Sequence, residues 1–186
     1  MIEIKTPILK GILKDHLKIK QEILKLIKEG NGGFFYHKGE KINDNIHKLD
    51  WGNSTNFNRE WVKLLTPYLR DALNSLVLKI GLSSVVFRDI WYQQYKYEGK
   101  HGWHTHGNNF TGVYYLDFDK ENHPKTDILN PSNPTEKISI EAEEGDLITF
   151  PSYFIHRGGL NLSNTTKTIV SFNIDIETPI FDLVKE

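Results

Sequence analysis

Two histidines placed two residues apart, His104 and His106, carry the clearest chemistry in this sequence. On an extended strand, side chains two positions apart leave the same face, so the two imidazoles can converge. Two neutral imidazoles can hold adjacent positions on a metal, and imidazole suits Fe, Zn, Cu and Ni. His156 follows much later, just after the apolar segment Leu147–Phe150, and is a third candidate. The pattern makes His104, His106 and His156 candidate metal ligands.

The residues around the histidine pair favour a partly enclosed site over an exposed one. Trp103 and the apolar segment Val113–Leu116 flank the pair, and nearby glycines allow the backbone to bend closely around it. His101 lies three residues before His104, off the shared face, and we expect it in a loop at the mouth of the site. The remaining histidines lie in helical or polar contexts and are interpreted as structural: His16, His37, His47 and His123.

Two helices are expected in the first part of the chain. Apolar residues recur with a 3.6-residue period from Pro7 to about Glu29 and again from about Arg59 to Ile80. Pro67 is expected to divide or kink the second helix, and Gly81 to end it. The polar stretch between the helices, up to Asn58, is interpreted as a loop.

Short β-rich segments dominate the rest of the chain and are separated by Gly, Asn and Pro clusters. They are Val85–Tyr97, Phe110–Phe118, Lys137–Ala142, Leu147–Phe150 and Lys167–Ile176. Two helices followed by many strands predict an α+β fold, mainly β, with helices packed on one side of an antiparallel sandwich or barrel. No repeat or linker is visible. We expect one domain over residues 1–186, with a helical part at 1–82 and a β core at 83–178.

The composition narrows the classes of function. A chain of 186 residues that is 38% hydrophobic is expected to be globular, and a net charge of -1 gives no reason to expect a nucleic-acid or membrane partner. The absence of cysteine excludes disulfides, thiolate ligands and a cysteine nucleophile. The N-terminus lacks the apolar core of a signal peptide, so a cytoplasmic location is expected.

Taken together, several motifs resemble one known family. His104-Thr-His106 is followed by Thr111-Gly-Val-Tyr-Tyr-Leu116, then by Gly145-Asp-Leu-Ile-Thr-Phe-Pro-Ser152, His156 and Ser171-Phe-Asn173. This order is similar to that of the 2-oxoglutarate/Fe(II) oxygenases of bacteria and phages, which are related to the prolyl hydroxylases. The resemblance covers residues from about 90 to 176, and Thr6-Pro7-Ile8 resembles the usual start of the family. It implies a double-stranded β-helix, a cupin-like jelly roll, with iron near one open end.

The sequence departs from the wider superfamily at one ligand. Most members of that superfamily use His-x-Asp and a distant His, whereas His106 stands here in the carboxylate position. The simplest transfer makes His104, His106 and His156 a three-histidine face, which leaves the iron with one more positive charge. An alternative leaves His106 outside the coordination shell, with water as the third ligand. Asp117 is the nearest carboxylate after Tyr115, and we interpret it as a strand-end residue.

The resemblance also implies a binding site for 2-oxoglutarate. The family usually places an arginine at the start of the last core strand to bind the far carboxylate, and Lys167 occupies that position. Period two puts Asn173 on the same face as Lys167, so both should point into the barrel. Tyr115 matches a tyrosine that donates to the same carboxylate, and Tyr95 is expected to line the pocket.

The function expected from this resemblance is an Fe(II)- and 2-oxoglutarate-dependent dioxygenase, a hydroxylase that uses O2 and releases succinate. Its substrate, a small molecule or a peptidyl group, is not readable; the loops Phe34–Asn58 and Asn122–Pro134 are expected to select it. One alternative is a cupin-like three-histidine metalloenzyme that does not use 2-oxoglutarate. Another is a non-catalytic sugar- or peptide-binding module with a vestigial metal site. A buried Lys167 would argue against the first alternative, and an intact histidine set argues against the second.

Overall fold

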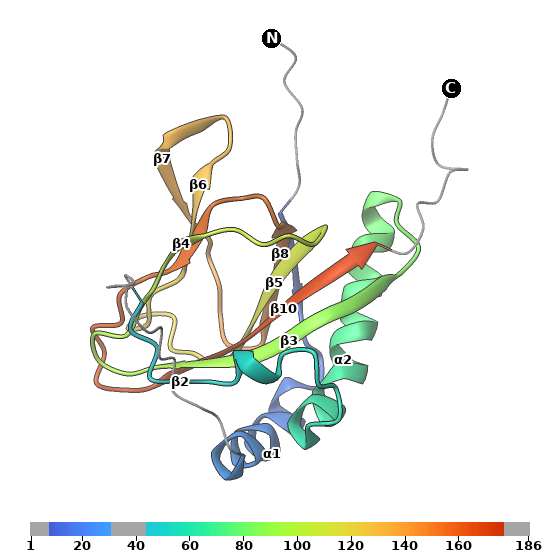
Figure 1. The fold of residues 1–186 in the computed structure, drawn as a ribbon, viewed down its shortest axis with the longest axis vertical. Coiled ribbons are helices and arrows are strands. Elements are labelled where there is room, and N and C mark those ends of the chain that lie inside the picture. The colour runs from blue at the N-terminus through green and yellow to red at the C-terminus, as the bar shows by residue number, and fades with distance from the viewer. Residues whose placement is uncertain (1–7, 31–43, 177–186) are drawn as a thin grey trace.

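Two antiparallel sheets face each other and enclose the middle of the molecule (Figure 1). The computed structural model describes residues 8–30 and 44–176. The larger sheet has the order β1-β8-β5-β10-β3-β2, formed by Leu9–Ile12, Asp146–Pro151, Phe110–Asp117, Lys167–Ile176, Val85–Tyr95 and Lys48–Leu49. The smaller sheet has the order β4-β9-β6-β7, formed by His101–His104, His156–Gly158, Thr126–Asn130 and Asn133–Ser139. The predicted jelly roll is confirmed.

The helices pack against the outer face of the larger sheet, as expected (Figure 1). Helix α1 spans His16–Glu29 and α2 spans Glu60–Val77, followed by the 3-10 turn η2 at Leu78–Ile80. Ile19, Ile23 and Ile27 recur every four residues, so they form one apolar stripe, and all three are buried. This stripe and that of α2 cover alternate residues of the sheet, among them Val170 and Phe172 of β10.

The other face of the larger sheet looks toward the smaller sheet. Because side chains alternate along a strand, Lys167, Ile169 and Ser171 of β10 point away from the helices. A second apolar cluster fills this interior and joins Ile169 to Ile128 of β6. The two faces of β10 therefore serve different purposes: one holds the helices, and the other contributes to the interior between the sheets.

The helix expected from Pro7 is wrong in its first half. Pro7 lies outside the described residues, and Leu9–Ile12 form the edge strand β1, which pairs with β8. The spacing of apolar residues is compatible with a helix here, but the segment satisfies its backbone through the sheet. Gly11 lies directly against Leu76 of α2, where an added Cβ would be 3.0 Å from a Leu76 methyl carbon. Helix α1 begins only at His16.

Pro67 does not divide the second helix. Helix α2 is continuous from Glu60 to Val77, because the buried Leu65 and Leu69 on either side of the proline hold it against the sheet. Gly81 ends the helical region with a left-handed conformation, φ 78°, as expected.

Several strand boundaries differ from the expectations. The strand expected at Lys137–Ala142 is observed as Asn133–Ser139, and the expected loop Asn122–Pro134 contains strand β6. These two strands form a projecting hairpin (Figure 1) whose second strand is exposed throughout, so apolar periodicity could not reveal it. Part of the expected loop Phe34–Asn58 lies outside the described residues; the rest contains β2 and the 3-10 turn η1, Trp51–Asn53.

Candidate active site

Three histidines converge where the smaller sheet meets the open end of the barrel. His104 ends β4, His106 follows it, and His156 begins β9, which pairs with β4. One ring nitrogen from each residue lies within 4.8 Å of those of the other two. The ring centroids are 4.2 Å apart for His104 and His156, 5.0 Å for His104 and His106, and 5.1 Å for His106 and His156. The sequence prediction that these three residues meet therefore holds in the structure.

Backbone hydrogen bonds orient two of the three rings. Nδ1 of His104 lies 2.7 Å from the Gly102 carbonyl oxygen, and Nδ1 of His156 lies 2.9 Å from that of Phe154. A carbonyl oxygen can only accept, so Nδ1 carries the proton in both rings and Nε2 keeps its lone pair. Such a bond fixes the tautomer that a metal-binding histidine needs.

The surroundings of the three histidines favour their neutral form. Burial lowers the pKa of His104 and His156, and it lowers the pKa of His106 to about 4. Neighbouring imidazoles add to this effect in His106 and His156, because a second positive charge beside the first is unfavourable. Since metal binding requires unprotonated imidazole, the cluster is ready to bind a divalent cation without first releasing protons.

A fourth histidine, His101, also lies in the site, although it was expected at the mouth. Its ring stacks on that of His104 with centroids 3.9 Å apart. The pairing of β4 with β9 shifts register between these two residues, so the three-residue spacing no longer separates their side chains. His101 approaches Asp44 at 3.8 Å and Gln93 at 3.4 Å.

Strand β3 supplies a polar network beside the histidines. The Tyr95 hydroxyl donates to Oε1 of Gln93 at 2.8 Å, and the Ser171 hydroxyl lies 3.4 Å from the same oxygen. With Oε1 as acceptor, the Gln93 amide nitrogen is the donor toward Nδ1 of His101. Gln93 carried no recognisable sequence motif and was missed; its alternation with Trp91 and Tyr95 on β3 is the signal that could have found it.

Lys167 lies inside the barrel and is only 1% exposed. Its ammonium donates to the Pro124 carbonyl oxygen at 2.5 Å, and the ring centroids of Tyr95, Tyr115 and Phe118 lie 5.5–5.7 Å away. Burial lowers the pKa of Lys167 to about 7, and Asp127 partly opposes the shift. The cavity that continues inward from the histidines measures about 20 Å³, room for about one water molecule, so a dicarboxylate enters only if side chains shift.

Tyr115 and Asn173 occupy different surroundings. The Tyr115 hydroxyl is buried beside Thr126, 2.7 Å from its hydroxyl and 3.3 Å from its backbone nitrogen. Asn173 is buried on the expected face of β10, but its amide donates to Asp89 at 3.0 Å, while its own Oδ1 has no partner. Ser171, not Asn173, is the residue of this strand that faces the histidine cavity together with Ile169.

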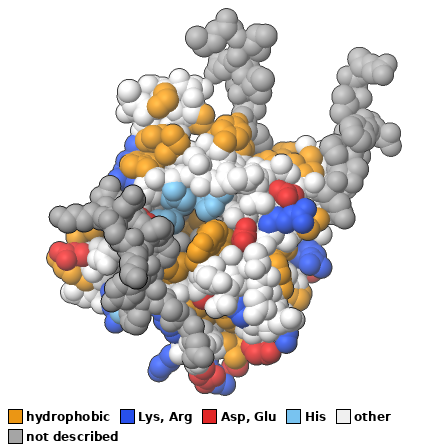
Figure 2. Space-filling view, in the orientation of Figure 1, with side chains coloured by type: hydrophobic (Ala, Val, Ile, Leu, Met, Phe, Trp, Pro, Cys, Tyr) orange, Lys and Arg blue, Asp and Glu red, His pale blue; other side chains and the backbone are white. Residues whose placement is uncertain are grey.

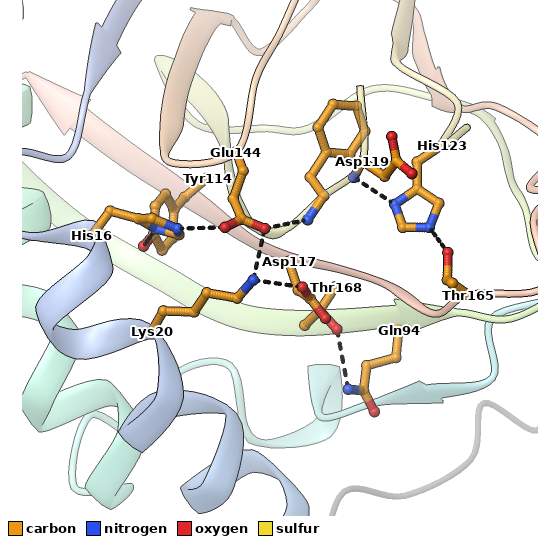
Figure 3. Close-up of polar contacts among 11 residues, drawn as sticks. His16, Lys20, Gln94, Tyr114, Asp117, Asp119, His123, Glu144, Thr165 and Thr168 are labelled. Atoms are coloured by element: carbon orange, nitrogen blue, oxygen red, sulfur yellow. Dashed lines mark hydrogen bonds and ion pairs between the residues drawn. The ribbon is translucent and has the colours of Figure 1, made fainter. Parts of the chain in front are cut away.

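His16 and His123 lie in structural networks away from the cluster (Figure 3). His123 accepts from the Asp119 backbone N–H at 3.0 Å and contacts the Thr165 hydroxyl at 2.8 Å, which fixes the loop that presents Pro124 to Lys167. His16 of α1 bonds to the Tyr114 hydroxyl at 2.6 Å and to Glu144 at 3.1 Å. In the same network (Figure 3), Lys20 bonds to Asp117 and Glu144, each at 2.7 Å, so Asp117 serves as a strand-end ion-pair residue.

A cleft opens beside the histidines, and Figure 2 shows hydrophobic atoms next to the pale blue imidazoles there. Its volume is about 220 Å³, and its lining includes Ile46, Leu49, Trp51 and Trp91. Three larger hollows contain none of the clustered histidines: those of about 530 and 430 Å³ lie beside α2, and one of about 460 Å³ lies beside β6 and β7. The chemistry therefore points to the smaller cleft, where a metal could be reached from outside.

Comparison with known proteins supports the resemblance seen in the sequence. Residues 89–173 match the family described as "Putative 2OG-Fe(II) oxygenase". This segment contains all three clustered histidines and Lys167. The family and the cluster of His104, His106 and His156 suit Fe(II) and 2-oxoglutarate. No curated protein matches the chain.

Solved structures with the same fold come from several sources. A viral collagen prolyl hydroxylase from Paramecium bursaria Chlorella virus-1, in complex with 2-oxoglutarate, is 19% identical, covers 90% of this chain and 94% of its own, and has a TM-score of 0.61. A Trichoplax adhaerens prolyl hydroxylase in complex with a hypoxia inducible factor peptide is 13% identical, with coverages of 97% and 89% and a TM-score of 0.67. The α-ketoglutarate-dependent epimerase SnoN from nogalamycin biosynthesis is 10% identical, with coverages of 93% and 77% and a TM-score of 0.68.

At these identities the likeness establishes the fold and nothing further. The three neighbours include two hydroxylases and an epimerase, so the fold does not determine the outcome of the reaction. The family match supports a 2-oxoglutarate/Fe(II) oxygenase. Among the described residues, no helix has the length and apolar character needed to cross a membrane.

Proposed function

We propose that this protein is a 2-oxoglutarate- and Fe(II)-dependent hydroxylase whose one domain, residues 1–186, holds iron through His104, His106 and His156. The observation that carries the proposal is the convergence of three imidazoles, with ligand atoms within 4.8 Å of one another, in a fold that also buries Lys167. Two neighbours of the same fold are prolyl hydroxylases, and we propose the same type of reaction here.

The donor set fits Fe(II). Imidazole nitrogen is a good ligand for iron, and two of the rings already have their Nδ1 proton held by a backbone carbonyl. Three neutral ligands leave the ion with its full double charge, which the two negative charges of 2-oxoglutarate would offset. When bound, the iron and 2-oxoglutarate supply the activation of O2, and the cosubstrate is converted to succinate.

Lys167 has the position and charge to bind the far carboxylate of 2-oxoglutarate. Among the described residues, its ammonium has one hydrogen-bond acceptor, the Pro124 carbonyl oxygen, and it lies among aromatic rings that provide no countercharge. A carboxylate would give this buried cation the partner that favours its charged form. Tyr115 and Tyr95 would form the walls, with Tyr115 as a second donor, and Asn173 would act at a distance by holding Asp89. A cupin-like site without 2-oxoglutarate has no use for such a lysine.

The test is the conversion of 2-oxoglutarate to succinate in the absence of any other substrate. We expect a slow reaction that requires both Fe(II) and O2, because enzymes of this class consume the cosubstrate without a substrate at a low rate. A Lys167→Met variant, which preserves the packing volume, should form no succinate at the same 2-oxoglutarate concentration. Succinate formation that is unchanged in Lys167→Met, or that proceeds without iron, would contradict the proposal.

A further inference from the structure

Trp51 is an exposed aromatic side chain at the edge of the cleft. It lies in η1, and 40% of its surface is accessible. Single exposed apolar residues are common, so exposure alone says little. What distinguishes Trp51 is the way in which the chain around it is held.

The residue before Trp51 is fixed by a buried hydrogen-bond network. Asp50 is 6% exposed and accepts from the Tyr92 backbone N–H at 2.9 Å, from Nε1 of Trp61 at 3.1 Å and from the Arg59 guanidinium. Arg59 also donates to the Ile90 carbonyl oxygen at 2.6 Å. The backbone that carries Trp51 is therefore tied to both α2 and β3. An exposed indole on a rigid support loses little conformational entropy when it binds a partner.

A path of aromatic rings leads from Trp51 to the histidines. The Trp51 and Trp91 rings meet at 85° with centroids 4.4 Å apart, and the Trp91 ring lies 5.8 Å from that of His106. Trp91 is 2% exposed, so it forms the inner wall and Trp51 the outer one. Two perpendicular indoles make a corner in which a flat ring can contact one face and one edge, the arrangements that aromatic pairs prefer.

The chemistry of the cleft selects against charge. Its described lining contains no lysine, arginine, aspartate or glutamate; beyond the apolar walls it consists of Gln93, Thr105 and three of the histidines. Two carboxylates lie nearby, but both accept hydrogen bonds: Asp44 from the Gly102 backbone N–H, and Asp89 from Ser54 and Asn173. A charged group placed here would lose water without meeting an opposite charge in the described lining itself, which is costly. The volume of about 220 Å³ is below the range of about 300–1,000 Å³ usual for whole drug-sized ligands, so it suits a single ring.

We propose that Trp51 and Trp91 bind an uncharged ring of the substrate and hold it beside the metal site, with Trp51 as the residue that determines specificity. This inference rests on the proposed function for the identity of the reaction, but the ring-binding step itself does not require iron. The ring can belong to a free small molecule or to a residue within a peptide; the cleft recognises the same chemistry in both.

The experiment measures ring binding to the full-length chain by saturation-transfer NMR without added metal. The neutral probes are indole as a free ring and N-acetylprolinamide as a ring within a capped residue. Indole-3-carboxylate and tryptamine are the charged counterparts. We expect at least one neutral probe to bind. If indole binds, indole-3-carboxylate and tryptamine should bind at least about tenfold more weakly than indole. The relative affinities of the two neutral probes distinguish a free ring from a peptide-borne one.

Trp51→Ala should weaken binding of the neutral probe about tenfold, and Trp51→Phe should restore part of the affinity. Trp103→Ala is the matched control, because Trp103 is equally exposed, at 40%, but stacks on Arg157 outside the cleft. Trp103→Ala should bind like the wild type.

Three results would overturn the inference: no neutral probe binds below about 10 mM, charged and neutral probes bind equally, or Trp51→Ala matches the wild type. Iron and 2-oxoglutarate binding are measured separately on the same variants and should be unchanged in Trp51→Ala. If the wild type binds neutral rings but takes up no iron, the proposed function fails while the ring site stands. If it takes up iron but binds no neutral ring, only the ring site is excluded.

Discussion

The three candidate ligands are not all held equally firmly. His104 and His156 each donate from Nδ1 to a backbone carbonyl, whereas His106 has no side-chain hydrogen bond among the described contacts and is held by its backbone bond to Ser152 and by the ring of Trp91. Oriented ligands contribute more to metal affinity than loosely held ones. We therefore expect the three positions to respond differently to substitution.

His104→Ala or His156→Ala should abolish stoichiometric Fe(II) binding, because two neutral ligands hold iron poorly, while the fold stays intact. His106→Asp should retain binding, since a carboxylate at this position completes a facial triad of two histidines and one carboxylate. The measurement is the iron content after anaerobic gel filtration, with circular dichroism as the folding check. His47→Gln, outside the cluster, is the control. Full iron binding by the His104→Ala and His156→Ala variants would exclude these residues as ligands.

Lys167→Met should weaken 2-oxoglutarate binding roughly 10- to 150-fold, because a charge-assisted contact to a carboxylate contributes on the order of 1.5–3 kcal/mol. Iron affinity should change little. The measurement is titration of 2-oxoglutarate into the anaerobic Fe(II) protein. Lys63→Met, which removes an exposed lysine of α2, serves as the control. Equal affinities in wild type and Lys167→Met would remove Lys167 from the cosubstrate site.

The affinity for 2-oxoglutarate should also depend on pH in a direction that Lys167 fixes. Burial lowers the pKa of the free lysine to about 7, and Asp127 is the charged neighbour that opposes this shift. The carboxylate binds the protonated form, so affinity should be constant below about pH 7 and fall by up to tenfold per pH unit above it. Titrations between about pH 6 and pH 9 measure this. The same fall in Lys167→Met would assign it to another group.

At the scale of secondary structure, the site depends on how η1 and β4 are fixed to the larger sheet. Asp50 joins η1 to α2 through Arg59 and Trp61 and to β3 through the Tyr92 backbone. The register shift between β4 and β9 brings His101 against His104. These features are set by long-range contacts, so a change in one of them should lower the free energy of unfolding of the whole domain.

Asp50→Ala should lower the free energy of unfolding by about 3–5 kcal/mol, because it leaves the mostly buried Arg59 guanidinium without its counterion. Urea denaturation measures the change. The control is Glu60→Ala, which removes only an exposed ion pair with Lys63 and should cost less than about 1 kcal/mol. A loss below 1 kcal/mol in Asp50→Ala would mean that the network does not hold η1.

At the scale of the whole molecule, the sequence predicts the layers and the histidine cluster because both follow from periodicity. The two-residue spacing of His104 and His106 and the alternation along β10 survive in the structure. The expectations that prove wrong concern features that depend on tertiary contacts. Leu9–Ile12 pair with β8 although their spacing also fits a helix. His101 enters the site through a register shift, and Trp51 matters only because Asp50 anchors it; neither has a local signal.

The most direct test of the central claim is visible absorption of the anaerobic protein on addition of Fe(II) and then 2-oxoglutarate. Chelation of the keto acid to histidine-bound iron should produce a weak metal-to-ligand charge-transfer band near the green region of the spectrum. The account predicts this band in the wild type, its loss in His104→Ala, and a higher 2-oxoglutarate requirement in Lys167→Met. If the wild type binds iron stoichiometrically but 2-oxoglutarate produces no band at any concentration, the protein is not a 2-oxoglutarate-dependent oxygenase.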